Sequence, residues 1–159
     1  MQQLAAAKAL TVAQALPGVT EPTVVLGCDS VLVVRGEVHG KPPSVEAAIA
    51  RWQSMRGHYG DLLSGHALVT LAGAAPQKPL VKFQSTRVHF ADVSDAEIRA
   101  YIATGEPMQC AGCFTLEGRG GAFIERIEGC YSNVIGLSLP LLRQMLAEQG
   151  YGLHEAWSS

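Results

Sequence analysis

Asp29 and Lys41 are the residues whose types and positions first suggest chemistry. Asp29 interrupts a run of apolar and small residues over 23–34, and Lys41 follows twelve positions later within Gly40-Lys41-Pro42-Pro43. A carboxylate at the end of a buried strand can bind a magnesium ion or activate a water molecule. A lysine between a glycine and two prolines is a compact cation on a stiff loop, which suits a phosphate. The alternatives are a turn aspartate that caps backbone N–H groups and a solvated surface lysine.

Further polar candidates lie in one predicted helix and in two loops. Lys8 has alanine and leucine neighbours, so its ammonium either reaches inward toward an anion or extends to water, and the sequence alone favours water. Glu117 begins a glycine-rich segment, 117–121, which lacks the GxGxxG order of a dinucleotide site and predicts a flexible turn carrying a carboxylate. Ser132 and Asn133 either hydrogen-bond a ligand or cap a turn.

The four cysteines are Cys28, Cys110, Cys113 and Cys130. Cys110 and Cys113 form a CxxC, but a redox pair normally opens a helix, and the residues that follow predict strand and loop. A zinc site needs four ligands, and the spacing of the other two cysteines fits no compact knuckle. We therefore expect packed thiols without disulfides, in a reducing cytoplasm.

The elements that must position these residues follow from periodicity and from turn residues. Helical spacing predicts helices over 3–16, 45–56, 95–103 and 139–149, the last three capped by Ser44, Ser94 and Ser138. Alternation and β-branched content predict strands over 23–28, 59–72 and 80–90, and short strands broken by glycines over 108–128. Residues 31–34 are expected either to continue the strand of residues 23–28 or to pair with it. Asp29 is then expected at the end of the first strand. The order of elements predicts an α/β fold with a mixed, twisted β-sheet flanked by helices.

The composition excludes several classes of protein. A chain of 159 residues, 48% of them apolar, suits one compact domain with a full core. The net charge is −2 and no basic cluster is present, so we expect no nucleic-acid partner. No apolar run approaches about 18 residues, so we expect no membrane partner. The alanine-rich N-terminus lacks the pattern of a signal peptide.

Taken in order, several short motifs of this chain resemble those of the Maf family of nucleotide pyrophosphatases. They lie at residues 4–9, 27–30, 40–42, 46–52, 64–66, 111–118 and 128–137. The resemblance implies a fold like that of the Maf and inosine-triphosphatase proteins. It also implies hydrolysis of a nucleoside triphosphate to a monophosphate and diphosphate. A divalent cation would assist, magnesium first, with manganese or cobalt as alternatives.

The resemblance also assigns roles to individual residues. Asp29 matches the family's metal-binding or water-activating carboxylate, and is the expected catalytic residue. Lys8 and Lys41 match two lysines that face phosphates, and Ser30 stands where the family often has threonine, as a substrate contact. Glu117 stands where many members have glutamine. Because a carboxylate only accepts hydrogen bonds, it suits the N–H groups of guanine, so we expect 7-methyl-GTP, with dTTP or UTP as alternatives.

One feature of the family is not found in this sequence. Members open with a strand and a loop resembling SxSPRR, whose arginines and N–H groups cradle the triphosphate. We therefore expect a single Maf-like domain over residues 1–159 that is N-terminally truncated, with an uncovered sheet edge through which two copies could form a homodimer. The alternative function is a catalytically impaired nucleotide-binding or regulatory protein linked to septum formation in cell division.

Overall fold

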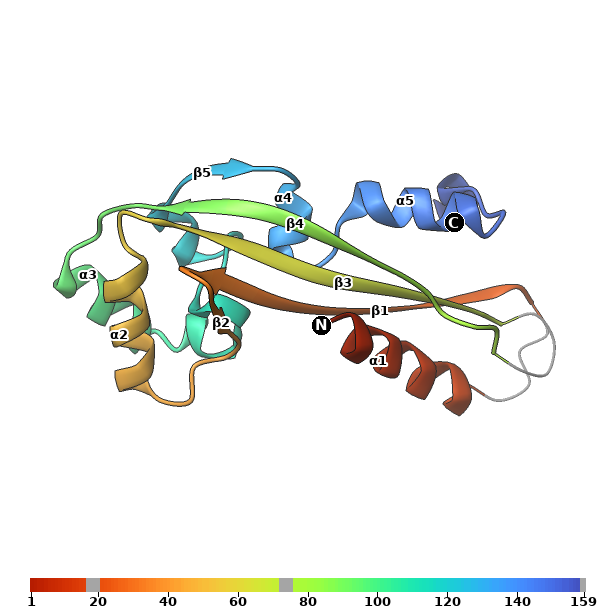
Figure 1. Ribbon diagram of the computed structural model, residues 1–159, viewed down its shortest axis with the longest axis horizontal. Coiled ribbons are helices and arrows are strands. Elements are labelled where there is room, and N and C mark those ends of the chain that lie inside the picture. Colours follow the sequence, from red (N-terminus) through yellow and green to blue (C-terminus); the bar gives the residue numbers. More distant parts are fainter. Residues whose placement is uncertain (17–20, 72–75, 158–159) are drawn as a thin grey trace. The chain divides into compact units, whose positions relative to one another are not determined.

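The computed structural model describes residues 1–16, 21–71 and 76–157. A five-stranded sheet has the order β2-β1-β3-β4-β5. The strands are β1 (Thr23–Val34), β2 (Glu37–His39), β3 (Tyr59–Leu71), β4 (Leu80–Phe90) and β5 (Ile124–Glu128), and the β1–β2 and β4–β5 pairs are antiparallel. The α-helices are α1 (Gln2–Ala15), α2 (Val45–Met55), α3 (Asp95–Ala103), α4 (Tyr131–Ile135) and α5 (Leu139–Glu148). The predicted α/β fold, a sheet flanked by helices, is confirmed (Figure 1).

The chain divides into two compact units. The first unit comprises Met1–Asp29, Ser64–Gln84 and Gly136–Ser159, and the second comprises Ser30–Leu63 and Ser85–Ile135. Strands β1, β3 and β4 contribute residues to both units. The expectation of a single domain stays a prediction. None of the helices among the described residues is both long enough and apolar enough to cross a membrane.

In the first unit, helices cover both faces of the strands. One core joins α1 to β1 and β3, and consists of Ala5, Ala9, Ala13, Val25, Ala67, Val69 and Leu71. A second core joins α5 to the opposite face of the strands, and consists of Leu68, Leu141 and Met145. Figure 1 shows α1 and α5 on either side of these strands. Successive strand residues point to opposite faces, so the alternation in β1 and β3 serves both cores.

Close packing of α1 on β1 depends on Gly27. A Cβ atom there would lie 2.8 Å from the backbone nitrogen of Ala9, a distance at which the helix or the strand must move. Small residues on both elements therefore let the helix backbone approach the strand. This approach brings Lys8, the residue before Ala9 in α1, within reach of β1.

The second unit is built around Trp52 of α2. Its ring meets those of Phe90, Tyr101 and Phe123 edge to face, with centroids 5.6–5.7 Å apart. Its indole nitrogen donates to the backbone oxygen of Cys113 at 2.7 Å, so the polar end of this fully buried side chain is satisfied. Helices α2 and α3 pack together in this unit, and their aromatic core fixes the loops that follow α3.

Most predicted boundaries are confirmed. Ser44, Ser94 and Ser138 each accept a hydrogen bond from a backbone N–H of the helix that they precede, and Ser94 with Glu97 forms a complete capping box. Arg35 and Gly36, with φ of 50° and 83°, form the turn between β1 and β2. The loop predicted between the third and fourth strands falls partly on residues 72–75, which lie outside the described residues.

Two predictions of local structure are wrong. Residues 31–34 continue the strand of residues 23–28, which was one of the two expected alternatives. The position expected for Asp29 is wrong, because this residue lies inside the twelve-residue strand β1 and not at its end. Residues 108–123 contain 3₁₀ turns in place of short strands: η1 (Glu106–Gln109), η2 (Ala111–Cys113) and η3 (Arg119–Phe123). Gly112 and Cys113 have φ of 77° and 64°, which is incompatible with strand backbone. Of the predicted strands in this region, the structure contains β5.

Candidate functional site

The first unit brings Lys8 and Asp29 together. The ammonium of Lys8 donates to Oδ1 of Asp29 at 2.7 Å and to the backbone oxygen of Cys28 at 3.2 Å. The lysine side chain is 57% exposed and the aspartate side chain 18%. Of the two alternatives for Lys8, the structure therefore has the contact with an anion, although the lysine also remains open to solvent. The contact itself, between residues 21 apart in sequence, was not predicted.

Asp29 keeps part of its carboxylate available. Val25, Gly27 and Asp29 alternate along β1, and this alternation points all three toward α1. Among the described residues, Oδ1 of Asp29 has a partner and Oδ2 has none. A carboxylate with one oxygen still available can accept a proton or bind a cation, while the ammonium beside it attracts an anion. Ser30, the next residue of β1, is half-buried.

Lys41 stands on a loop that is fixed from two directions. The backbone oxygen of Gly40 accepts hydrogen bonds from the guanidinium of Arg51 at 2.6 Å and from the N–H of Gly112 at 3.3 Å. The Lys41 side chain is exposed, with its ammonium 3.5 Å from Oε1 of Gln109, at the outer limit of a hydrogen bond. The stiff loop expected from the prolines is thus also held by α2 and η2. Neither Arg51 nor Gln109 was singled out from the sequence, although Arg51 lies within the motif at residues 46–52.

Glu117 is exposed in the segment between η2 and η3, in the same unit as Lys41. Both charges act on the Cys110 thiol: burial chiefly raises the pKa of Cys110, Glu117 raises it further, and Lys41 lowers it. Glu117 and Lys41 therefore both lie near Cys110. The guanidinium of Arg119 faces Glu106, 3.7 Å from Oε2.

Ser132 and Asn133 are buried residues of α4. The amide nitrogen of Asn133 donates to the hydroxyl of Thr86 at 3.1 Å and to the backbone oxygen of Leu62 at 3.4 Å. Thr86 in turn exchanges hydrogen bonds with the backbone of Cys130. These contacts of Asn133 join α4 to β3 and β4, a structural role that differs from the expected turn cap.

The cysteines are free thiols. Burial raises the pKa of Cys113 to about 11, and burial also raises the pKa of Cys28. A thiol with a raised pKa is protonated at neutral pH, which opposes nucleophilic and metal-binding chemistry. This agrees with packed thiols.

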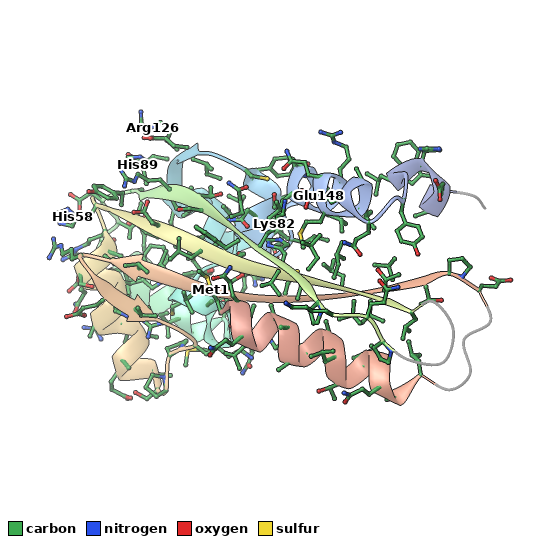
Figure 2. The ribbon with its side chains drawn as sticks, turned by 45° about the vertical axis from the view of Figure 1, so that its right-hand side comes forward. Met1, His58, Lys82, His89, Arg126 and Glu148 are labelled. Carbon is green, nitrogen blue, oxygen red and sulfur yellow. The ribbon has the colours of Figure 1, made fainter. Side chains whose placement is uncertain are left out.

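A second polar cluster covers the strands of the second unit, on the face away from Trp52. His89 lies 2.7 Å from Glu128, Arg126 contacts both, and Arg87 makes two hydrogen bonds of 2.8 and 3.1 Å to Asp61. Figure 2 shows His89 and Arg126 next to each other at this surface. Because each carboxylate here already faces a cation, the cluster offers no unpaired charge to a ligand.

Comparison with known proteins agrees with the motifs. The model of the Maf-like protein family matches residues 1–149. Curated relatives include proteins of Synechococcus elongatus, 55% identical over the whole chain and 77% of the relative, and of Thermosynechococcus vestitus, 60% identical over 94% of this chain and 73% of the relative. A third, from Rippkaea orientalis, is 54% identical over 98% of this chain and 72% of its own length. All three are named nucleoside triphosphate pyrophosphatase. This chain belongs to the Maf family.

Proposed function

We propose that the protein hydrolyses nucleoside triphosphates between the α and β phosphates, giving a nucleoside monophosphate and diphosphate. The observation that carries this proposal is the Lys8–Asp29 contact of 2.7 Å in a chain of the Maf family. The shared name of the relatives, nucleoside triphosphate pyrophosphatase, supports the same reaction. The enzyme is then a hydrolase acting on a phosphoanhydride bond.

In this reaction a water oxygen forms a bond to the α-phosphorus as the bond to the bridging oxygen breaks, and diphosphate leaves with that oxygen. Negative charge is spread over the phosphate oxygens during the displacement. The ammonium of Lys8 stabilises this charge, since it is 57% exposed and can contact phosphate while remaining near Asp29. Asp29 orients the attacking water and accepts its proton. Lys41 is a further phosphate ligand and Ser30 a further substrate contact.

A divalent cation is part of the proposal, with magnesium as the first choice and manganese or cobalt as alternatives. The described residues contain no group of three or more His, Cys, Asp or Glu side chains that could hold a metal ion. Asp29 fits another mode, because magnesium is commonly held by one or two carboxylates together with waters and substrate phosphates. Its second carboxylate oxygen would be the protein ligand of the cation, as the alternative to activating the attacking water. The cation would supply charge neutralisation to the polyphosphate.

Glu117 is the proposed contact with the base. It is exposed, and it lies on an irregular segment whose side chains can meet a ligand. A carboxylate accepts from the N1–H and N2–H groups of guanine, and its charge favours a cationic 7-methylguanine. We therefore propose 7-methyl-GTP ahead of dTTP and UTP.

The experiment is diphosphate release from UTP, dTTP, GTP and 7-methyl-GTP with magnesium, using the wild type, Asp29→Asn and Glu125→Gln. Glu125 is an exposed glutamate of β5, so its variant is a control with the same loss of charge. Release that Asp29→Asn lowers by about 10²–10⁴-fold, and that the control leaves unchanged, is the expected result. No release by the folded wild-type chain would contradict the proposal and favour the nucleotide-binding, regulatory alternative.

A further inference from the structure

The carboxylate of Glu106, at the start of η1, is held by hydrogen bonds from residues of the same chain. It accepts three hydrogen bonds, from the Thr115 hydroxyl at 2.5 Å and from the backbone N–H groups of Arg119 and Gly120, each at 3.1 Å. The side chain is 19% exposed. Donors on both sides of Glu117 thus converge on one carboxylate. The backbone segment that carries Glu117 has no strand partner, so these bonds replace the hydrogen bonds of regular structure.

Tyr101 of α3 supplies a second fixed point. Its hydroxyl accepts a hydrogen bond from the N–H of Thr115 at 3.1 Å and lies 3.4 Å from the hydroxyl of the same residue. The Tyr101 ring packs edge to face against Trp52 at 5.7 Å. The segment is therefore attached to the aromatic core of the second unit at its start, and to Glu106 at both ends.

The fit around Glu106 is close. A Cβ atom on Gly118 would lie 2.6 Å from Oε1 of Glu106 and 2.6 Å from the hydroxyl of Thr115. A Cβ atom on Gly120 would overlap the Tyr101 hydroxyl. The two glycines let the backbone wrap around the carboxylate, leaving Glu117 as the exposed side chain between the points of attachment.

We propose that Glu106 is a positioning residue that fixes segment 115–121 and thereby presents the Glu117 carboxylate to the base in one orientation. This inference rests on the proposed function, in which Glu117 contacts the base. Glu106 itself does not contact the base, because both of its oxygens are occupied by residues 115, 119 and 120.

The charge of Glu106 fits this role. The Thr115 hydroxyl chiefly, followed by the amides of Arg119 and Gly120, outweighs the effect of burial and lowers the pKa of Glu106 to about 2. The carboxylate is therefore ionised at every pH at which an enzyme of this kind would be assayed. A glutamine can reproduce its shape, but it places an NH₂ group against at least one N–H donor.

The test is a double-mutant cycle of Glu106→Gln and Glu117→Gln, measuring kcat/KM for 7-methyl-GTP, GTP and UTP. Glu106→Gln is expected to reduce the selectivity among bases by about tenfold, and Glu117→Gln by a similar factor. If Glu106 acts through Glu117, the double variant shows no further loss of selectivity. Glu125→Gln should leave the selectivity unchanged.

Two further readouts separate a positioning role from a general loss of structure. Inhibition by diphosphate, which carries no base, should be unchanged in Glu106→Gln. Amide hydrogen exchange should accelerate at Arg119 and Gly120, and this needs no catalytic activity. If the wild type does not hydrolyse nucleotides but Glu106→Gln still shows this faster exchange, the proposed function is wrong and the fixing of segment 115–121 by Glu106 stands. Equal losses for every nucleotide, an additive double variant, or unchanged exchange would each overturn the positioning role.

Discussion

Asp29 in the first unit and Glu106 in the second are equally covered carboxylates that are held in different ways. Their side chains are 18% and 19% exposed. Asp29 has one oxygen in contact with a solvent-exposed lysine, whereas Glu106 accepts three hydrogen bonds from Thr115, Arg119 and Gly120. Exposure alone therefore does not distinguish the carboxylate proposed as catalytic from the one that is bound by its own chain. The number and kind of partners do, because a carboxylate saturated by its own chain has no oxygen left for a ligand.

The largest expected effect comes from removing the charge of Asp29. Asp29→Asn should lower diphosphate release by about 10²–10⁴-fold, since the amide neither accepts a proton nor binds a cation well. Its free energy of unfolding should change by less than about 1 kcal/mol, because the ion pair with Lys8 is partly exposed. Activity assays and urea unfolding check both parts. If Asp29→Asn is inactive because it is unfolded, Asp29 has a structural role like that of Glu106, and the contrast between the two carboxylates is wrong.

Gly27→Ala tests how the Lys8–Asp29 contact is maintained. The added methyl would press on the backbone of α1 near Ala9, so we expect a loss of about 1–3 kcal/mol in the free energy of unfolding. Gly40→Ala is the matched control for stability, because a Cβ atom there meets nothing within 4 Å. Urea unfolding of both variants is the measurement. Equal stability of the two variants would mean that α1 does not pack on β1 as described.

Lowering the pH should weaken the contribution that Glu106 makes to the free energy of unfolding. The folded pKa, about 2, lies below the ordinary value of 4.5, so the stabilisation is present above pH 4.5 and is lost as the pH falls toward 2. The difference in unfolding free energy between wild type and Glu106→Gln should therefore shrink over this window. Urea unfolding of both proteins at pH 7, 5, 4 and 3 measures it. A difference that does not change with pH would contradict the low pKa.

His66 gives a separate acid effect, at higher pH, in the first unit. Burial lowers the pKa of His66, which the contact of Nδ1 with the Ser64 carbonyl only partly offsets. Its Nε2 accepts from the Ser138 N–H at 2.9 Å and must be unprotonated to do so. This contribution is present above the ordinary pKa of 6.5 and is lost below it. His66→Gln should remove the part of the pH dependence that lies just below pH 6.5.

The smallest expected effect concerns Lys82 and Glu148, an ion pair of the first unit shown in Figure 2. Their side chains are 32% and 47% exposed, so Lys82→Met should change stability by less than about 1 kcal/mol and leave activity unchanged. Lys8→Met, which removes the same charge beside Asp29, should reduce activity. Equal activities of the two variants would show that position near Asp29 gives Lys8 no special role.

The sequence by itself determined most of the elements and their caps. The Ser94–Glu97 capping box, the Ser138 cap and the Trp52 face of α2 depend on residues three or four positions apart, so local pattern predicts them. The motif set also predicted the family. Residues 108–123 were predicted wrongly because alternation does not register that Gly112 and Cys113 have positive φ.

Tertiary structure alone decided which candidate residues meet. Lys8 reaches Asp29 across 21 residues of sequence because α1 packs closely on Gly27, a consequence of small residues that carry no chemical signal of their own. Glu106 was not singled out, since its donors lie up to 14 residues away and two of them are backbone N–H groups, which every residue except proline provides. The type of a side chain shows which interactions it can make. The packing of distant segments decides its partners, and these determine whether any of its polar atoms is left to bind a ligand.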